Sequence, residues 1–325
     1  MRPYAFTRPG SVRAALAEAD GGSAYLAGGT TLVDLMKLEV STPSRVVDIN
    51  RLPLDGISVD SDGLHIGALA RMSDVAGDQA VRTRYPMISQ ALELSASPQL
   101  RNMASMGGNL LQRTRCSYFR DLTTACNKRE PGSGCAALTG HNRMHAVLGT
   151  SEACVATHPS DVAVALVALD TQVHLESRDG TRTVALAEFY RLPGQTPQVE
   201  NDLRPGELIT GLTVPTLPWA TRSLYLKIRD RQSYEFALTS VAVALDLDGA
   251  RIRGARVAAG GVGTRPWRLG AVEQALVGRT ATPDTYEAVV ASVAEDARTL
   301  PHNVFKPALL RRTLVRALVT LGGRA

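Results

Sequence analysis

The amino-acid sequence, 325 residues long, predicts an α+β fold. In its last third, apolar segments at 241–247 and 250–257 flank Asp248-Gly249 as an antiparallel hairpin. Three apolar helical patterns follow, at about 269–276, 286–297 and 307–321. Strands followed by helices are typical of α+β domains, whereas a doubly wound parallel sheet alternates the two. No G-x-G-x-x-G follows a predicted strand, which disfavours an ordinary dinucleotide-binding fold.

The first third predicts a strand, a glycine loop and a helix in succession. A helix over 11–19, with Ser11 as its N-cap, precedes them. The strand covers 24–27, the tight loop 28–30 and the second helix 31–38. A further strand is expected at 45–49, and a hairpin at 57–59 and 64–67, joined through Asp62-Gly63.

The middle of the chain predicts one long irregular segment. Helical spacing runs over 72–96, and small residues and glycines fill 101–109. The segment 110–153 has no apolar period and is too long for an ordinary connection, so we expect a functional or ligand-stabilised loop. Regular structure resumes at 161–169, and a last unit begins near Leu224.

Composition excludes several classes of protein. Hydrophobic residues make up 44% of the chain and charged residues 21%, as in ordinary globular proteins. Lys and Arg exceed Asp and Glu by 36 − 31, or five charges, which are scattered, so we expect no nucleic-acid partner. The longest uncharged apolar run, 162–169, is far short of the roughly 20 residues that span a bilayer. Without a secretory or twin-arginine signal, we expect a cytoplasmic protein, or one exported to the periplasm with a signal-bearing partner.

All four cysteines fall within one 39-residue stretch, spaced C-x9-C-x8-C-x18-C. They are Cys116, Cys126, Cys135 and Cys154. Two disulfides suit a secreted protein, and structural zinc usually takes a close C-x(2–4)-C pair, which is absent. A 4Fe-4S cluster needs four separated thiolates, which long intervals on a glycine-containing loop provide. The spacing favours the cluster, while zinc, disulfides and unconnected buried thiols stay open.

The neighbours of the cysteines suit a cluster. Six basic side chains crowd the stretch, where we expect them to offset the charge of four thiolates: Arg113, Arg115, Arg120, Lys128, Arg129 and Arg143. We also expect the backbone N–H groups of 132–134 to point at cluster sulfurs. Because four cysteines complete a cluster, we interpret His141 and His145 as surface or hydrogen-bonding residues.

Two glycine stretches and one acidic stretch suggest a nucleotide site. The segment 26–32 places two glycines and two hydroxyls between a strand and a helix start, a geometry that holds phosphates, although a Gly-Gly turn required only for packing is the alternative. The segment 104–109 again combines glycines with hydroxyl and amide groups. In 156–161, Asp161 can accept hydrogen bonds from a ribose or a ring.

Five features, spread over nearly the whole chain, resemble the sequence landmarks of one protein family and occur in the same order. They are the segments 27–31, 101–109, 157–161 and 206–209 and the residue Lys227. This family comprises the FAD-binding subunits of xanthine dehydrogenases and carbon monoxide dehydrogenases. The resemblance is strongest to the flavin and 4Fe-4S subunit of bacterial heterotrimeric aldehyde oxidoreductases, where a cysteine-bearing insertion follows the Gly-Gly-Asn element. The flavin subunit of 4-hydroxybenzoyl-CoA reductase is a related case with a cluster.

The resemblance implies a fold and a domain division. The fold is the two-subdomain FAD-binding fold of the vanillyl-alcohol-oxidase-like (PCMH) type, followed by a C-terminal α+β domain with an antiparallel sheet and helices. The first subdomain spans 1–55. The second spans 56–222, with the cluster loop inserted at about 110–155, and the C-terminal CO-dehydrogenase-flavoprotein-like domain spans 223–325.

The resemblance also implies the cofactor-binding residues. The FAD pyrophosphate is wrapped by Leu26, Ala27, Gly28, Gly29, Thr30, Thr31 and Leu32. The nucleotide portion contacts Ser105, Gly108 and Asn109, while Asp161 and Ile209 bind near the adenosine or the flavin, and Lys227 lies near the isoalloxazine. The four cysteines ligate the 4Fe-4S cluster.

The implied function is electron transfer, with no catalytic residue in this chain. A large molybdopterin-binding partner oxidises a substrate, expected to be an aldehyde, and a small partner with two 2Fe-2S clusters passes the electrons to FAD. The flavin then reduces an external acceptor. Two alternatives stay open: an assembly scaffold with a metal or disulfide loop, and a free-standing flavin reductase or oxidase of the same fold.

Overall fold

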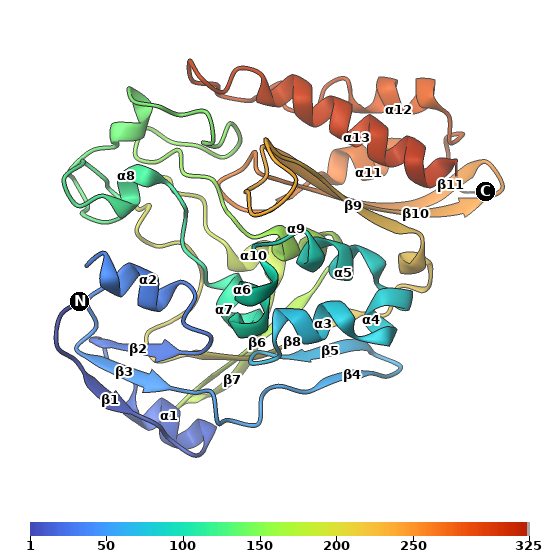
Figure 1. Ribbon diagram of the computed structural model, residues 1–325. Coiled ribbons are helices and arrows are strands. Elements are labelled where there is room, and N and C mark those ends of the chain that lie inside the picture. The colour runs from blue at the N-terminus through green and yellow to red at the C-terminus, as the bar shows by residue number, and fades with distance from the viewer. Residues whose placement is uncertain (324–325) are drawn as a thin grey trace.

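The computed structural model describes residues 1–323 and builds three sheets and their helices from them (Figure 1). The first 55 residues form a small parallel sheet of order β1-β3-β2. Its elements are β1 (Ala5–Thr7), α1 (Val12–Glu18), β2 (Ser23–Leu26), α2 (Leu32–Lys37) and β3 (Arg45–Asp48). The hydroxyl of Ser11 accepts a hydrogen bond from Ala14 N at 3.2 Å, which confirms the predicted N-cap.

A five-stranded antiparallel sheet of order β4-β5-β8-β6-β7 follows. Its strands are β4 (Ile57–Val59), β5 (Gly63–Gly67), β6 (Gln172–Ser177), β7 (Gly180–Ala185) and β8 (Leu208–Pro215). The helices packed near it are α3 (Met72–Gly77), α4 (Gln79–Arg84), α5 (Pro86–Glu93), α6 (Pro98–Met103), α7 (Met106–Leu110), α9 (Asp161–Ala168) and α10 (Leu186–Phe189). The predicted hairpin through Asp62-Gly63 is confirmed.

The helical spacing predicted over 72–96 is divided among three short helices. Asp78 ends α3 and caps α4, because its carboxylate accepts from Val81 N at 3.0 Å. Pro86 has no N–H to extend α4 and instead occupies the first turn of α5. These two residues allow the chain to turn between helices that bury different faces.

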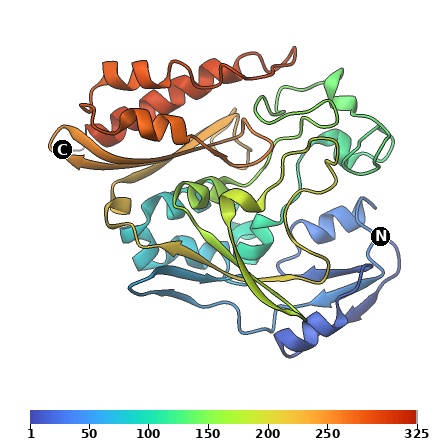
Figure 2. The same cartoon turned by 180° about the vertical axis from the view of Figure 1, so that it is seen from behind.

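The C-terminal unit is a four-stranded antiparallel sheet of order β12-β11-β10-β9, covered on its outer face by three helices (Figure 2). The strands are β9 (Ser223–Ile228), β10 (Thr239–Asp248), β11 (Arg251–Gly260) and β12 (Trp267–Arg268), after a 3-10 turn η2 (Pro218–Thr221). The helices are α11 (Gly270–Leu276), α12 (Pro283–Val290) and α13 (Lys306–Gly322). Asp248 pairs with Arg251 across the turn, and Gly249 adopts φ +55°, which confirms the predicted hairpin.

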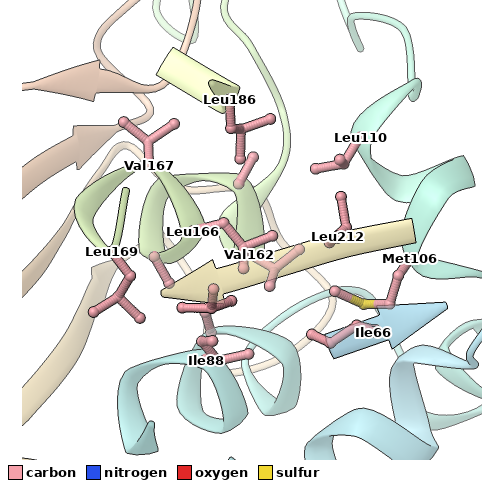
Figure 3. Packing of buried hydrophobic residues seen from close by; sticks show 14 of the residues in the cluster. Ile66, Ile88, Met106, Leu110, Val162, Leu166, Val167, Leu169, Leu186 and Leu212 are labelled. Atoms are coloured by element: carbon pink, nitrogen blue, oxygen red, sulfur yellow. The ribbon is translucent and has the colours of Figure 1, made fainter. Parts of the chain in front are cut away.

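Helix α9 lies in the middle of the molecule. Every residue of α9 is buried. Figure 3 shows Val162 and Leu166 meeting Ile88 of α5 and Leu212 of β8. On its other side α9 packs on β10 and β11 of the C-terminal sheet. One helix therefore contributes to the core beneath both large sheets.

The predicted irregular segment is confirmed as a long loop with two short elements, α8 (Ser117–Arg120) and η1 (Ala136–Leu138). We call residues 111–160 the cysteine loop. It lies over α2 and beside the C-terminal sheet (Figure 1), and Phe119 packs on Leu35 of α2. Its later part, at Val147, joins the core of the C-terminal unit. Within residues 1–323, no helix is long and apolar enough to cross a membrane.

Candidate functional site

The glycine loop after β2 is pressed against the junction of α6 and α7. A Cβ atom on Gly28 would lie 1.9 Å from the Met103 carbonyl oxygen, and Gly29 adopts φ +72°. Asn50 donates through Nδ2 to the carbonyl oxygen of Ala27 at 2.9 Å. A glycine is therefore required at position 28. This close contact brings the segment 26–32 against the segment 104–109.

A large cavity, which we call the main cleft, opens beside these glycines and has an empty volume of about 1350 Å³. Six of the residues that the sequence singles out line it: Thr30, Thr31, Gly108, Asn109, Asp161 and Lys227. They come from the loop between β2 and α2, from α7, from α9 and from β9. The fold thus brings residues nearly 200 positions apart to one cleft.

Other residues singled out for this site serve the framework. Ser105 is buried and caps α7, since its hydroxyl accepts from Gly108 N at 3.2 Å. Asn109 accepts from the Ser160 hydroxyl at 2.6 Å, which fixes its amide. Ile209 lies in β8 opposite Leu175, within the core. Leu26 ends β2, Ala27 and Gly29 complete the loop, and Leu32 begins α2.

Asp161 and Lys227 form a buried ion pair with an Oδ2–Nζ distance of 2.8 Å and side-chain exposures of 7% and 1%. Oδ1 accepts from the Tyr225 hydroxyl at 2.6 Å, and Oδ2 accepts from the Ser95 hydroxyl at 3.1 Å. Burial, together with the negative charge of Asp161, raises the pKa of Tyr225 well above its ordinary value. These contacts hold the wall of the main cleft in one arrangement.

The four cysteines converge on a small enclosed cavity with an empty volume of about 280 Å³. Residues 126 and 135 pair as an antiparallel bridge, so the backbone places their side chains side by side. Phe119, Ala137 and Ala156 supply apolar walls. All four thiols are free in this structure. Among residues 1–323, no group of three or more His, Cys, Asp or Glu side chains is placed to hold a metal ion.

The basic residues of the cysteine loop make contacts other than those expected. Glu200 pairs with Arg113 and Lys128, and Asp34 pairs with Arg115 and Arg120. Arg143 pairs with Asp230. Arg129 donates hydrogen bonds to the carbonyl oxygens of Tyr118 and Phe119. These contacts fasten the loop to the rest of the chain. The expectation for the glycine N–H groups is wrong, because Gly132 N and Gly134 N donate to Oδ1 of Asn127 at 3.1 and 2.8 Å.

His145 is a residue whose position the sequence does not reveal. Its Nε2 lies 3.2 Å from Sγ of Cys116, and the ring is buried. Burial lowers the pKa of His145 to about 4, and burial raises the pKa of the Cys116 thiol to about 11. His145 is thus a neutral hydrogen-bonding residue, as interpreted, but beside a cysteine rather than on the surface.

A second cavity of about 1000 Å³ separates the cysteines from the main cleft. Cys116 and His145 line one part of it. Arg115, Asp161 and Phe236 line both this cavity and the main cleft. Each candidate site therefore shares wall residues with the cavity that lies between them.

Comparison with protein families matches residues 2–217 to the FAD-binding domain of molybdopterin dehydrogenases and residues 224–321 to the C-terminal domain of CO dehydrogenase flavoproteins. The chain belongs to the family of FAD-binding subunits of molybdenum hydroxylases, and it is a subunit of a FAD-dependent oxidoreductase. This confirms the resemblance inferred from the sequence landmarks, and with it the expected α+β fold.

Individual relatives agree with this family. The aldehyde oxidoreductase FAD-binding subunit PaoB of Escherichia coli is 50% identical over 307 residues, covering 94% of this chain and 93% of the relative. The glyceraldehyde dehydrogenase medium chain of Sulfolobus acidocaldarius is 28% identical, covering 90% and 87%. The structure of carbon monoxide dehydrogenase from Hydrogenophaga pseudoflava matches with a TM-score of 0.77 at 23% identity, over 100% of this chain and 99% of that one. At that identity the likeness concerns the fold alone.

Proposed function

We propose that this chain is the electron-transfer subunit of a molybdenum-dependent aldehyde oxidoreductase, holding FAD in the main cleft and a 4Fe-4S cluster among its four cysteines. The observation that carries the proposal is the cavity between the two sites, which Cys116 lines from one site and Asp161 from the other. The similarity to the Escherichia coli subunit supports aldehyde oxidation by the complex. A large molybdopterin-binding subunit and a small subunit with two 2Fe-2S clusters are the proposed partners.

For FAD, we assign residues 26–32 to the pyrophosphate. The close contact of Gly28 with Met103 fixes the course of this loop, and the hydroxyl-bearing Thr30 and Thr31 line the cleft. Gly108 and Asn109 then bound the nucleotide portion, with Ser105 shaping this segment from behind. Asp161 and Lys227 stand as a fixed pair near the flavin ring, and Ile209 supports this wall from the core. FAD supplies the redox chemistry, and these residues orient it and exclude water.

For the cluster, the arrangement of the thiols supports a multi-iron site. In a 4Fe-4S cluster each thiolate binds a different iron, so the sulfurs surround a volume instead of meeting at one ion. Cys116, Cys126, Cys135 and Cys154 line one enclosed, largely apolar cavity in this way.

The test uses the purified complex. Acid extraction is expected to release one FAD per copy of this chain, and iron and sulfide analysis is expected to give four of each beyond the partner's clusters. Cys135→Ser is expected to remove these four irons and the matching EPR signal, whereas Thr123→Ala, exposed in the same loop and bonded to Asp121, retains them. A complex without flavin, or with zinc in place of iron, would contradict the proposal. The cytoplasmic or partner-exported location is tested by fractionation of cells with and without the partner's signal.

A further inference from the structure

Arg115, directly before Cys116 in the chain, reaches out of the cysteine loop into the main cleft. Its side chain is 29% exposed, and it lines both the main cleft and the second cavity. Nη2 donates to Oγ1 of Thr31 in the glycine loop at 3.4 Å, and Nη1 lies 3.5 Å from Oδ2 of Asp34. Its Nε is buried and has no hydrogen-bond partner within residues 1–323. The guanidinium is therefore incompletely hydrogen-bonded, and the part of it that the cleft exposes is not the Nε atom.

The local charges are unbalanced. Arg120 also donates to Oδ2 of Asp34, so two guanidinium groups face one carboxylate. Nη1 of Arg120 is likewise buried without a partner in the described part of the chain. Of the other charged residues that line the cleft, Arg231 faces Glu235, and Lys227 faces Asp161. The excess positive charge lies beside Thr31, where the glycine loop supplies only the partial charges of backbone N–H groups.

An uncompensated, partly buried cation is costly unless an anion approaches it. The pyrophosphate of FAD carries negative charge on oxygens that accept hydrogen bonds from guanidinium groups. We propose that Arg115 binds the FAD pyrophosphate directly, so that the cysteine loop forms part of the flavin site. This inference rests on the proposed function and assigns one further residue to it.

The position of Arg115 in the chain couples the two cofactors. Residue 116 is a proposed cluster ligand, so a bound cluster fixes the backbone from which the Arg115 side chain extends. Loss of the cluster frees that backbone and weakens the contact with FAD. By linkage, bound FAD must favour the ordered cysteine loop to the same degree.

The experiment measures the affinity of the intact complex for FAD and for riboflavin, after removal of bound flavin, by fluorescence titration. Riboflavin has the isoalloxazine but no phosphate. Arg115→Gln is expected to weaken FAD binding about 10- to 100-fold, the usual effect of losing a charged hydrogen bond, and to leave riboflavin affinity unchanged. Arg143→Gln is the matched control, because Arg143 lies in the same loop, pairs with Asp230 at 2.8 Å and does not line the cleft. The control is expected to bind FAD as the wild type does.

Coupling is measured with Cys135→Ser, which removes a cluster ligand that lies outside the main cleft. It is expected to weaken FAD binding at least about 5-fold, within the usual range of coupling between two sites. If Arg115→Gln does not assemble, Arg115→Lys retains the charge and is expected to give a smaller loss for FAD and none for riboflavin.

Equal FAD affinity in the wild type and Arg115→Gln would overturn the inference while leaving the proposed function intact. Equal losses for FAD and riboflavin would overturn it as well, because Arg115 would then act on the shape of the cleft. A wild-type complex that binds neither FAD nor riboflavin would instead contradict the proposed function.

Discussion

Asp161 carries a buried charge that neutralises another buried charge, Lys227, at the wall of the main cleft. We expect Asp161→Asn to leave the Lys227 ammonium buried without its counter-ion and to lower the free energy of unfolding by about 3–5 kcal/mol. Urea unfolding followed by circular dichroism measures this loss. Asp60→Asn is the control, since Asp60 is exposed in the turn between β4 and β5, and it is expected to change stability by less than about 1 kcal/mol. Equal midpoints for the two variants would contradict the prediction.

His145 is expected to raise the reduction potential of the proposed cluster. A metal-bound thiolate has no proton, so the contact between Cys116 Sγ and His145 Nε2 requires the ring to donate, which stabilises the more negative, reduced state. We expect His145→Leu to lower the midpoint potential on the order of tens of millivolts, because hydrogen bonds to cluster sulfurs help set it. EPR-monitored redox titration checks this, with His141→Leu as the control. A midpoint unchanged in both variants would show that the ring is only packing.

Residue roles were predictable from sequence where they depend on near neighbours. The Ser11 cap needs only the next helical turn, and it is confirmed. The contact between Cys116 and His145 spans 29 positions and depends on how the whole loop folds back. The three hydrogen-bonding partners around Asp161 and Lys227 are Tyr225 of β9 and Leu94 and Ser95 at the end of α5, far from Asp161 in the chain, so the sequence identified both residues but not their pairing.

At the scale of elements, the glycine loop depends on its contact with the end of α6. We expect Gly28→Ala to push this loop away from Met103, because the added Cβ would meet its carbonyl oxygen at 1.9 Å. The cost is about 1–3 kcal/mol of stability, as for other overpacked sites, together with loss of FAD from the complex. Flavin content and thermal unfolding measure both. Gly10→Ala, with no atom within 4 Å of the new methyl group, is expected to keep both properties, and a normal Gly28→Ala protein would refute the prediction.

Elements were predictable to different degrees. Both hairpins predicted at an Asp-Gly pair are confirmed, because short turns of this kind are specified locally, but each turn lies one residue from the predicted pair, at Ser61-Asp62 and at Gly249-Ala250. The segment 72–96 was expected to continue as one helical pattern, but capping by Asp78 and the missing N–H of Pro86 divide it. The helix expected over 286–297 ends at Val290, and Ala294 adopts φ +64°, outside the helical region.

At the scale of the whole molecule, Lys306 joins the last helix to the cysteine loop. Its buried Nζ donates to the carbonyl oxygens of Met144 at 3.1 Å and Gly261 at 2.6 Å. Burial, and then the positive charge of Arg143, lowers the pKa of Lys306 from 10.5 to about 7, and His145 faces it as a neutral ring. Between these two pKa values the unfolded chain binds more protons than the folded chain, so stability rises with pH in this window.

We therefore expect the free energy of unfolding of the wild type to increase between pH 7 and pH 10 relative to Lys306→Met, by on the order of a few kcal/mol. Chemical unfolding at a series of pH values measures the difference. Below pH 7 the two curves are expected to run parallel. Parallel curves up to pH 10 would mean that the folded chain keeps this ammonium charged throughout.

The class of fold and the family were readable from the sequence because their landmarks occur in a fixed order. The contacts between the cysteine loop and the rest of the fold could not be predicted from the sequence, because they depend on surfaces that form only after each segment has folded. Phe119 packing on Leu35, and Lys306 reaching Met144, place the cysteine loop against two distant segments. No hydrophobic periodicity within the cysteine loop predicts either contact.

The central position of α9 has a consequence for dividing this chain. Ala242, Ala244 and Ala258, from the C-terminal sheet, belong to the same apolar core as Val162 and Leu166 of α9. A chain cut between residues 222 and 223 would leave each fragment with an apolar face that only the other covers. Such fragments would aggregate when made separately and complement each other when made together, so a gene for this subunit cannot be divided at that point into two independently soluble products.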